Sequence, residues 1–129
     1  MNSSLKNKWA LVTGASRGVG QQIAIGLAQY GVNLVLHSSN IENQKSTVNL
    51  LKKYNVIIMN VAGSLESNED ITQFVTDAEL MSGGIDILYN NAAIMTSATP
   101  LFETLQCDYE KSFQVNLFSM MYSLFIDVE

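Results

Sequence analysis

Three glycines within seven residues, Gly14, Gly18 and Gly20, follow directly on an apolar run near the amino terminus. Glycine permits positive φ angles and lets a ligand come close to the backbone, so this spacing predicts a loop between a strand and a helix. The first N–H groups and the positive dipole end of that helix would face an anion held in the loop, and a pyrophosphate fits this description. The alternative is a tight strand-to-helix turn that binds nothing.

The size and charge of the chain limit what else it can be. Its 129 residues, 47% hydrophobic and 15% charged, have the length of one globular domain, which we expect to span residues 1–129. A net charge of −5 disfavours nucleic acid and anionic membranes as partners. One cysteine and one histidine cannot build a structural zinc site, so we expect no metal. The lack of a signal-like or membrane-spanning apolar run predicts a cytoplasmic protein with a small-molecule role.

The rest of the sequence alternates between short apolar runs and segments with helical periodicity. Connections this short predict an α/β fold with a doubly wound parallel sheet of the Rossmann type. The sheet is expected to be incomplete, with four strands in the order 3-2-1-4, and this order puts the glycine loop at the switch point where ligands bind. The predicted strands are the run that ends at Val12 and residues 33–36, 56–59 and 85–89; the predicted helices are 19–30, 42–54, one from 67–70 to 83–84 and one from about 108.

Three separate motifs resemble those of the short-chain dehydrogenase/reductase family. The loop Thr13–Gly20 is similar to the family's Thr-Gly-x-x-x-Gly-x-Gly cofactor loop. The segment Asn90-Asn91-Ala92-Ala93 resembles the family's Asn-Asn-Ala-Gly, with Ala93 in place of the glycine. Asn116 stands where the family carries the asparagine of its catalytic Asn-Ser-Tyr-Lys set. The resemblance covers nearly the whole chain, and within the family the sequence is similar to 3-oxoacyl-carrier-protein reductase-like members.

The resemblance implies an oxidoreductase that reduces a carbonyl or oxidises an alcohol by hydride transfer, and a full-length form that is a homo-oligomer, dimer or tetramer. It also implies that Asn116 serves the active site, the alternative being a polar helix residue whose amide is satisfied inside the fold. Cofactor contacts are implied at Gly14, Ser16, Arg17, Gly18, Val19, Gly20, His37, Ser38, Ser39, Asn60, Val61, Asn91, Ala92 and Ala93.

The end of the predicted second strand favours NADP(H), with NAD(H) as the other candidate. A carboxylate there would bind the ribose hydroxyls of NAD and repel a 2′-phosphate, but the sequence has His37, Ser38 and Ser39 and no acid. Arg17 can supply a guanidinium fork for the phosphate, and the two serines can supply hydroxyl donors. His37 could assist when protonated, or it could be a surface residue at a strand end. Asn60, after the predicted third strand, could accept a hydrogen bond from the adenine amine.

The catalytic pair of the family is missing from the sequence. In the family a tyrosine transfers the proton, and a lysine four residues later lowers the tyrosine pKa. None of the five tyrosines here is followed by a lysine at that distance. We therefore expect the cofactor-binding half of a longer protein or a truncated product, inactive as it stands. The alternative is a non-catalytic dinucleotide-binding module.

Overall fold

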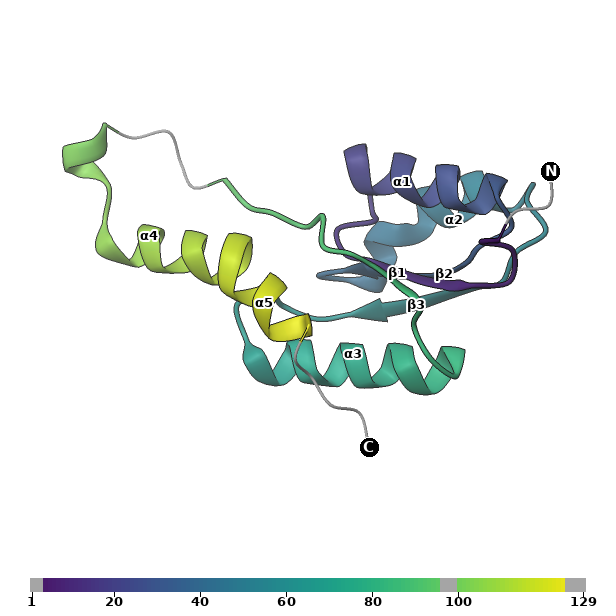
Figure 1. Ribbon diagram of the computed structural model, residues 1–129. Helices are drawn as coiled ribbons and strands as arrows, with labels where there is room; N and C mark the ends of the chain where they lie inside the picture. Colours follow the sequence, from purple (N-terminus) through teal and green to yellow (C-terminus); the bar gives the residue numbers. More distant parts are fainter. Residues whose placement is uncertain (1–3, 96–99, 125–129) are drawn as a thin grey trace.

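A four-stranded parallel sheet forms the centre of the computed structural model, which describes residues 4–95 and 100–124 apart from the side chain of Leu101 (Figure 1). Leu11 lies beside Val35 on one side and beside Leu88 on the other. The predicted fold class, parallel pairing and strand order are confirmed. The strands are β1 (Trp9–Val12), β2 (Asn33–Ser38), β3 (Ile58–Ala62) and β4 (Ile87–Tyr89), in the order β3-β2-β1-β4.

Helices cover both faces of this sheet. Helices α1 (Gly18–Gln29) and α2 (Lys45–Leu51) lie on one face, and α3 (Asn68–Ser82) lies on the other (Figure 1). Among the described residues, no helix is long and apolar enough to cross a membrane. The remaining elements are the short 3-10 turns η1 (Ile41–Gln44) and η2 (Leu101–Glu103), helix α4 (Gln106–Phe113), the π-helical turn η3 (Gln114–Phe118) and helix α5 (Ser119–Leu124).

The alternation of side chains along the strands fills a core on each face of the sheet. All six residues of β2 are buried, as expected for a parallel sheet with helices on both sides. The core under α1 and α2 contains Ala10, Val12, Leu34 and Leu36 with Ala24, Leu27, Ala28 and Leu51. The core under α3 contains Leu11, Val35 and Val61 with Ile71, Phe74, Val75 and Ala78. These two cores hold the carboxyl ends of the strands at one common edge.

Helix α3 shows why the sequence folds as predicted locally. The Ser67 hydroxyl accepts a hydrogen bond from the backbone N–H of Asp70 at 3.2 Å, which caps the first turn. Gly83 ends the helix in the left-handed region, at φ 77°, where a side chain would be strained. The loop before α3 is thereby fixed at the edge of the sheet where the glycine loop lies.

Some boundaries differ from the predicted ones. Strand β3 pairs from Ile58 to Ala62 because it follows its partner β2 from Leu34 to Ser38, so Asn60 lies inside the strand and not after it. Strand β4 is shorter than predicted and consists of residues 87–89, which pair with Ala10, Leu11 and Val12 of β1. The predicted helix 42–54 is a 3-10 turn followed by a short helix, and the last predicted helix begins at Gln106 and contains a π-helical turn.

Candidate functional site

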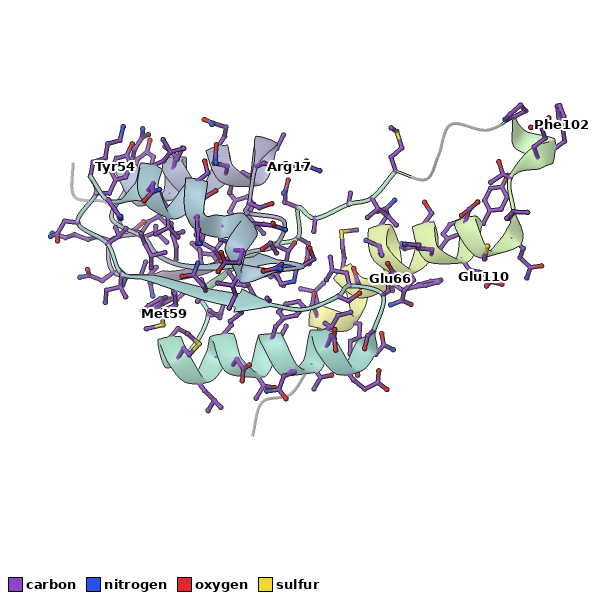
Figure 2. The ribbon with its side chains drawn as sticks, turned by 180° about the vertical axis from the view of Figure 1, so that it is seen from behind. Arg17, Tyr54, Met59, Glu66, Phe102 and Glu110 are labelled. Atoms are coloured by element: carbon purple, nitrogen blue, oxygen red, sulfur yellow. The ribbon has the colours of Figure 1, made fainter. Side chains whose placement is uncertain are left out.

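A cavity of about 430 Å³ opens at the carboxyl ends of β1, β2 and β3. Four segments and one helix residue line it, and they come from widely separated parts of the chain. Figure 2 shows Arg17 at the end of the sheet that faces α4, with Tyr54 at the opposite end. The lining residues are Gly14, Ser16–Val19, His37–Ser39, Gly63–Glu66, Asn91–Ile94 and Val115. This is the position at which parallel α/β sheets bind their ligands.

The glycine loop has the geometry of a backbone cradle. Gly14 and Gly18 adopt positive φ angles of 66° and 57°. A Cβ atom on Gly18 would meet no atom within 4 Å, so the backbone here borders open space in the cavity. A Cβ atom on Gly20 would lie 2.1 Å from the Gly14 carbonyl oxygen, so only glycine fits. Gly20 therefore shapes the loop from behind and does not line the cavity, whereas Gly14, Ser16, Arg17 and Val19 do.

Thr13 joins the glycine loop to the segment after β4. Its Oγ1 accepts hydrogen bonds from the backbone N–H groups of Asn91 at 3.0 Å and Ala92 at 3.1 Å, and donates to the Tyr89 carbonyl at 3.3 Å. The Asn91 side-chain Nδ2 donates to the carbonyls of Thr13 and Gly14 at 3.1 and 3.3 Å. Asn91 therefore holds two walls of the cavity together, and Ala92 and Ala93 beside it face the space between them.

The corner after β2 offers fewer polar donors than the sequence predicted. Arg17 and Ser39 are exposed, and among the described residues the Arg17 guanidinium has no ion-pair partner. The Ser38 side chain is buried, and its hydroxyl already donates to the Asn40 carbonyl at 2.6 Å. Of the two predicted serine donors, the structure leaves Ser39 available to a ligand.

His37 is buried, with 2% of its surface exposed, so the alternative of a surface histidine is wrong. Its ring stacks on Phe74 at 4.1 Å, because its side chain points to the α3 face like that of Val35. Its Nε2 lies 3.0 Å from the Gly63 carbonyl, which can only accept, so this nitrogen carries the proton. Burial lowers the His37 pKa below its ordinary value of 6.5, and the hydrogen bond to Gly63 offsets part of this effect. A protonated His37 beside a phosphate is therefore disfavoured.

The structure does not bring Asn60 and Val61 to the described cavity. The Asn60 side chain points to the opposite face of β3 and donates to Gln44 Oε1, and the Val61 side chain is part of the core under α3. The reason is that β3 continues for two residues beyond Asn60. The cavity wall is instead formed by the loop Gly63–Glu66, which the sequence reasoning missed. The start of this loop is set by the pairing of β3 with β2, which ends beside Ala62, and no local sequence signal marks it.

Asn116 lies in the π-helical turn η3, next to the lining residue Val115. Its Oδ1 accepts from the Ile94 backbone N–H at 2.8 Å, and its Nδ2 donates to the Ile94 carbonyl at 2.9 Å. These two hydrogen bonds join the cavity wall formed by residues 91–94 to the π-helical turn. This pairing gives Asn116 a structural contact, and its role in the reaction stays a prediction.

The cavity fits a dinucleotide by its own features. The backbone at Gly18 borders open space at the amino terminus of α1, where a phosphate is stabilised by N–H groups and the helix dipole. His37 Nδ1 is buried without a hydrogen-bond partner among the described residues, on a side chain that lines the same cavity. The exposed guanidinium of Arg17 adds the positive charge that an anionic ligand requires.

Comparisons with known proteins agree with this geometry. A gluconate 5-dehydrogenase of Gluconobacter oxydans (strain 621H) is 35% identical over 114 residues, which are 88% of this chain and 44% of that protein. A 3-oxoacyl-acyl-carrier-protein reductase of Aquifex aeolicus (strain VF5) is 35% identical over 118 residues, 91% of this chain and 47% of that protein. A crystal structure of a metagenomic short-chain oxidoreductase in complex with NADP matches with a TM-score of 0.88 and 30% identity, over 95% of this chain and 55% of the other.

The chain spans about half the length of the curated relatives it matches. The model of the short chain dehydrogenase family matches residues 8–124, which include the glycine loop, the sheet and the segment around Asn116. With the parallel sheet in the order β3-β2-β1-β4 and the cavity at its carboxyl edge, this match shows that the chain belongs to the short chain dehydrogenase family.

Proposed function

We propose that this chain binds NADP(H) and forms the cofactor-binding part of an oxidoreductase that interconverts a carbonyl and an alcohol. The observation that carries the proposal is the corner after β2, where exposed Arg17 and Ser39 face the cavity and no carboxylate stands at the strand end. A 2′-phosphate would find a guanidinium there, whereas the ribose hydroxyls of NAD would find no acid. Support also comes from the related oxidoreductase that was crystallised with NADP.

Each wall of the cavity has a separate part in holding the cofactor. The N–H groups at the start of α1 bind the pyrophosphate, and Arg17 binds the 2′-phosphate. Asn91 keeps the segment after β4 against the glycine loop, so that Ala92 and Ala93 contact the ribose side of the cofactor. The bound nicotinamide supplies or takes the hydride. The neutral state of His37 keeps the adenosine end of the cavity free of a second positive charge.

In the family, a tyrosine and a lysine four residues later carry out the proton transfer, and this sequence contains no such pair. Positioning of the cofactor alone does not replace a proton donor. We therefore propose that the 129 residues bind the cofactor without turning over a carbonyl substrate. The second candidate, a non-catalytic dinucleotide-binding module, is favoured by the same missing pair and predicts the same binding.

Oligomerisation and location belong to the proposal as well. Large apolar side chains are exposed on the segment from η3 to α5, including Phe118 and Met121. Exposed apolar patches of this kind mark association surfaces, so we propose a homo-oligomeric full-length form. A cytoplasmic location stays a prediction from the sequence.

The test is a titration of the protein with NADPH and NADH, repeated with Arg17→Ala. Loss of a bidentate phosphate pair should weaken NADPH binding by about 1.5–3 kcal/mol and leave NADH binding unchanged. Lys53→Ala is the matched control, because Lys53 is a cation beside Tyr54 at the other end of the sheet. Equal affinities of the parent protein for the two cofactors would overturn the preference for NADP(H).

A further inference from the structure

Gln44 is a fully buried amide behind the corner after β2, with 0% of its surface exposed. It belongs to η1, which packs on both β2 and β3. Its Nε2 donates to the Val61 carbonyl at 2.8 Å and to Ser38 Oγ at 3.0 Å. Its Oε1 accepts from Asn60 Nδ2. The two hydrogens of the amide and its oxygen are therefore all paired, and the amide ties the end of β2 to β3 without adding a charge.

The chemistry of these groups fixes the direction of each hydrogen bond. The Val61 carbonyl can only accept, so the NH₂ end of Gln44 must face it. The second hydrogen of that NH₂ then points to Ser38 Oγ, which must accept. The Ser38 hydroxyl therefore donates its single hydrogen to the Asn40 carbonyl, at 2.6 Å. This chain of bonds leaves Ser38 no hydrogen for a phosphate.

The same bonds determine the shape of the corner. Ser38 holds the Asn40 carbonyl, and the Asn40 side chain accepts from the Glu42 N–H at 2.9 Å, so residues 38–42 form one hydrogen-bonded turn. Ser39 lies in this turn, exposed and on the lining of the cavity together with Arg17. Any loosening of the turn moves Ser39 relative to Arg17.

We propose that Gln44 is a positioning residue for recognition of the 2′-phosphate, acting through Ser38. Gln44 and Ser38 form an internal link that holds Ser39 opposite Arg17, and Ser38 itself is not a ligand of the phosphate. This inference rests on the proposed NADP(H) binding and extends it to a residue that does not line the cavity. The competing explanation is that Ser38 donates directly to the phosphate.

Two nucleotides that differ only by the 2′-phosphate, adenosine 2′,5′-bisphosphate and 5′-AMP, are the probes, and the readout is the ratio of their dissociation constants by calorimetry. Gln44→Met keeps the volume and removes the hydrogen bonds. We expect it to weaken binding of the bisphosphate by on the order of tenfold and binding of 5′-AMP by less than about twofold. Ser38→Ala cuts the same link and should give a similar change, with no further loss in the double variant.

Two outcomes would show that Ser38 is a direct ligand and overturn the inference. In the first, the effects of Gln44→Met and Ser38→Ala on the ratio add up in the double variant. In the second, the ratio changes with Ser38→Ala and not with Gln44→Met. Asn60→Leu covers the case in which Gln44→Met fails to fold. It removes the donor to Gln44 Oε1 without touching Ser38, and it should shift the ratio in the same direction by about threefold. An unchanged ratio in Asn60→Leu would then overturn the inference.

Asn33→Leu is the matched control for stability. Asn33 Oδ1 accepts from the Ile57 N–H at 2.9 Å, so it also ties β2 to the chain at β3, but at the start of both strands. It should lower the melting temperature and leave the ratio unchanged. A parent protein that binds neither nucleotide, or both equally, overturns the proposed cofactor. If the parent protein prefers the bisphosphate to 5′-AMP, and Gln44→Met and Asn60→Leu have the same ratio of dissociation constants as the parent, only the role of Gln44 is overturned.

Discussion

The sheet with its covering helices and the arm formed by η2, α4, η3 and α5 are built in different ways. Every residue of β2 is buried, whereas no residue of α4 is buried. The part of the arm formed by η2 and α4 extends away from the layers in Figure 1, whereas α5 lies beside α3. Figure 2 shows Phe102 at the far end of the arm, where it is 87% exposed. Burial of apolar side chains thus stabilises the sheet, whereas among the described side chains of the arm burial is confined to η3 and α5, where Val115 is buried and α5 packs on α3.

Polar contacts also join the arm to the rest of the structure. Asn116 pairs with the backbone of Ile94, and Gln114 Nε2 donates to Asn68 Oδ1 at 3.2 Å. Lys111 forms an ion pair with Glu66 at 3.0 Å. Two of these contacts reach residues that line the cavity, Ile94 and Glu66. The difference between the regions teaches that the nucleotide end of the site is set by packing, while its α4 side depends on a small number of hydrogen bonds.

The largest expected effect lies in the packed region. Gly20→Ala would place a Cβ atom 2.1 Å from the Gly14 carbonyl oxygen, so we expect a loss of more than about 3 kcal/mol in the free energy of unfolding. Nucleotide binding should be lost with it. The control is Gly26→Ala in the same helix, where a Cβ meets nothing within 4 Å and a gain of about 0.5–1 kcal/mol is expected. Denaturant unfolding measures both, and equal effects would contradict the role of close packing.

Thr13→Val tests the hydrogen-bonded link between two walls of the cavity. It keeps the shape of the side chain but leaves the Ala92 N–H without an acceptor, whereas the Asn91 N–H keeps its bond to the Tyr89 carbonyl at 3.0 Å. We expect a loss of about 1–3 kcal/mol in the free energy of unfolding, from one unpaired donor. Thr72→Val, on α3, removes a hydroxyl that donates to a helix carbonyl and accepts from the exposed Tyr122 hydroxyl, and it should cost less than about 1 kcal/mol. Similar losses in the two variants would show that the link at Thr13 contributes no more to stability than a hydroxyl on the surface of α3.

Asn116→Leu tests the attachment of the arm. Loss of two hydrogen bonds to Ile94 should cost about 2 kcal/mol and act locally. Hydrogen exchange of the Ile94 amide should become much faster, while amides in β2 should keep their protection. Ser112→Ala is the control, because its hydroxyl accepts from Asn116 Nδ2 at a long distance of 3.5 Å. Uniformly faster exchange in β2 would show that the arm and the sheet unfold as one unit.

His37 gives the packed region a pH dependence. Because burial lowers its pKa in the folded state, the unfolded chain binds the proton first as the pH falls. The stability is therefore complete above the ordinary value of 6.5 and decreases as the pH falls below it, by up to about 1.4 kcal/mol per pH unit, until the folded-state pKa is reached. His37→Phe, which keeps a ring against Phe74, should have a flatter profile between pH 6.5 and 5. The same slope in both proteins would exclude His37 as its source.

The smallest effect is expected at the exposed ion pair of the arm. Lys111 and Glu66 are each about half exposed, so Lys111→Met should change the free energy of unfolding by less than about 1 kcal/mol. The change should disappear at high salt, because exposed charges are screened. Thermal unfolding at low and high salt measures it. A large loss that salt does not reduce would mean that the pair is a main attachment of the arm.

The sequence was sufficient where one local rule governs the outcome. Apolar runs such as Leu34–Leu36 predicted the buried strand β2, and Ser67 and Gly83 predicted the ends of α3. The glycine loop predicted the position of the cavity, because the order of strands and helices fixes where parallel strands end. The resemblance in Thr13–Gly20 and Asn90–Ala93 predicted the family that the comparisons show.

Other features could not be predicted because they depend on partners far away in the chain. The end of β3 is set by its pairing with β2, which moved Asn60 to the opposite face and brought Gly63–Glu66 to the cavity. The Ser38 hydroxyl looked available until Gln44, six residues later, was placed against it. His37 looked like a strand-end surface residue until Phe74 covered it.

By itself, the sequence determined the α/β fold, the order of its strands and the edge of the sheet at which a ligand binds, since these follow from periodicity, short connections and the position of Gly14, Gly18 and Gly20. Only the tertiary structure decided which side chains at that edge are available. Hydrogen-bond donors are few and each can be used once, so a donor such as Ser38 is removed from the site by a neighbour that the local sequence does not reveal.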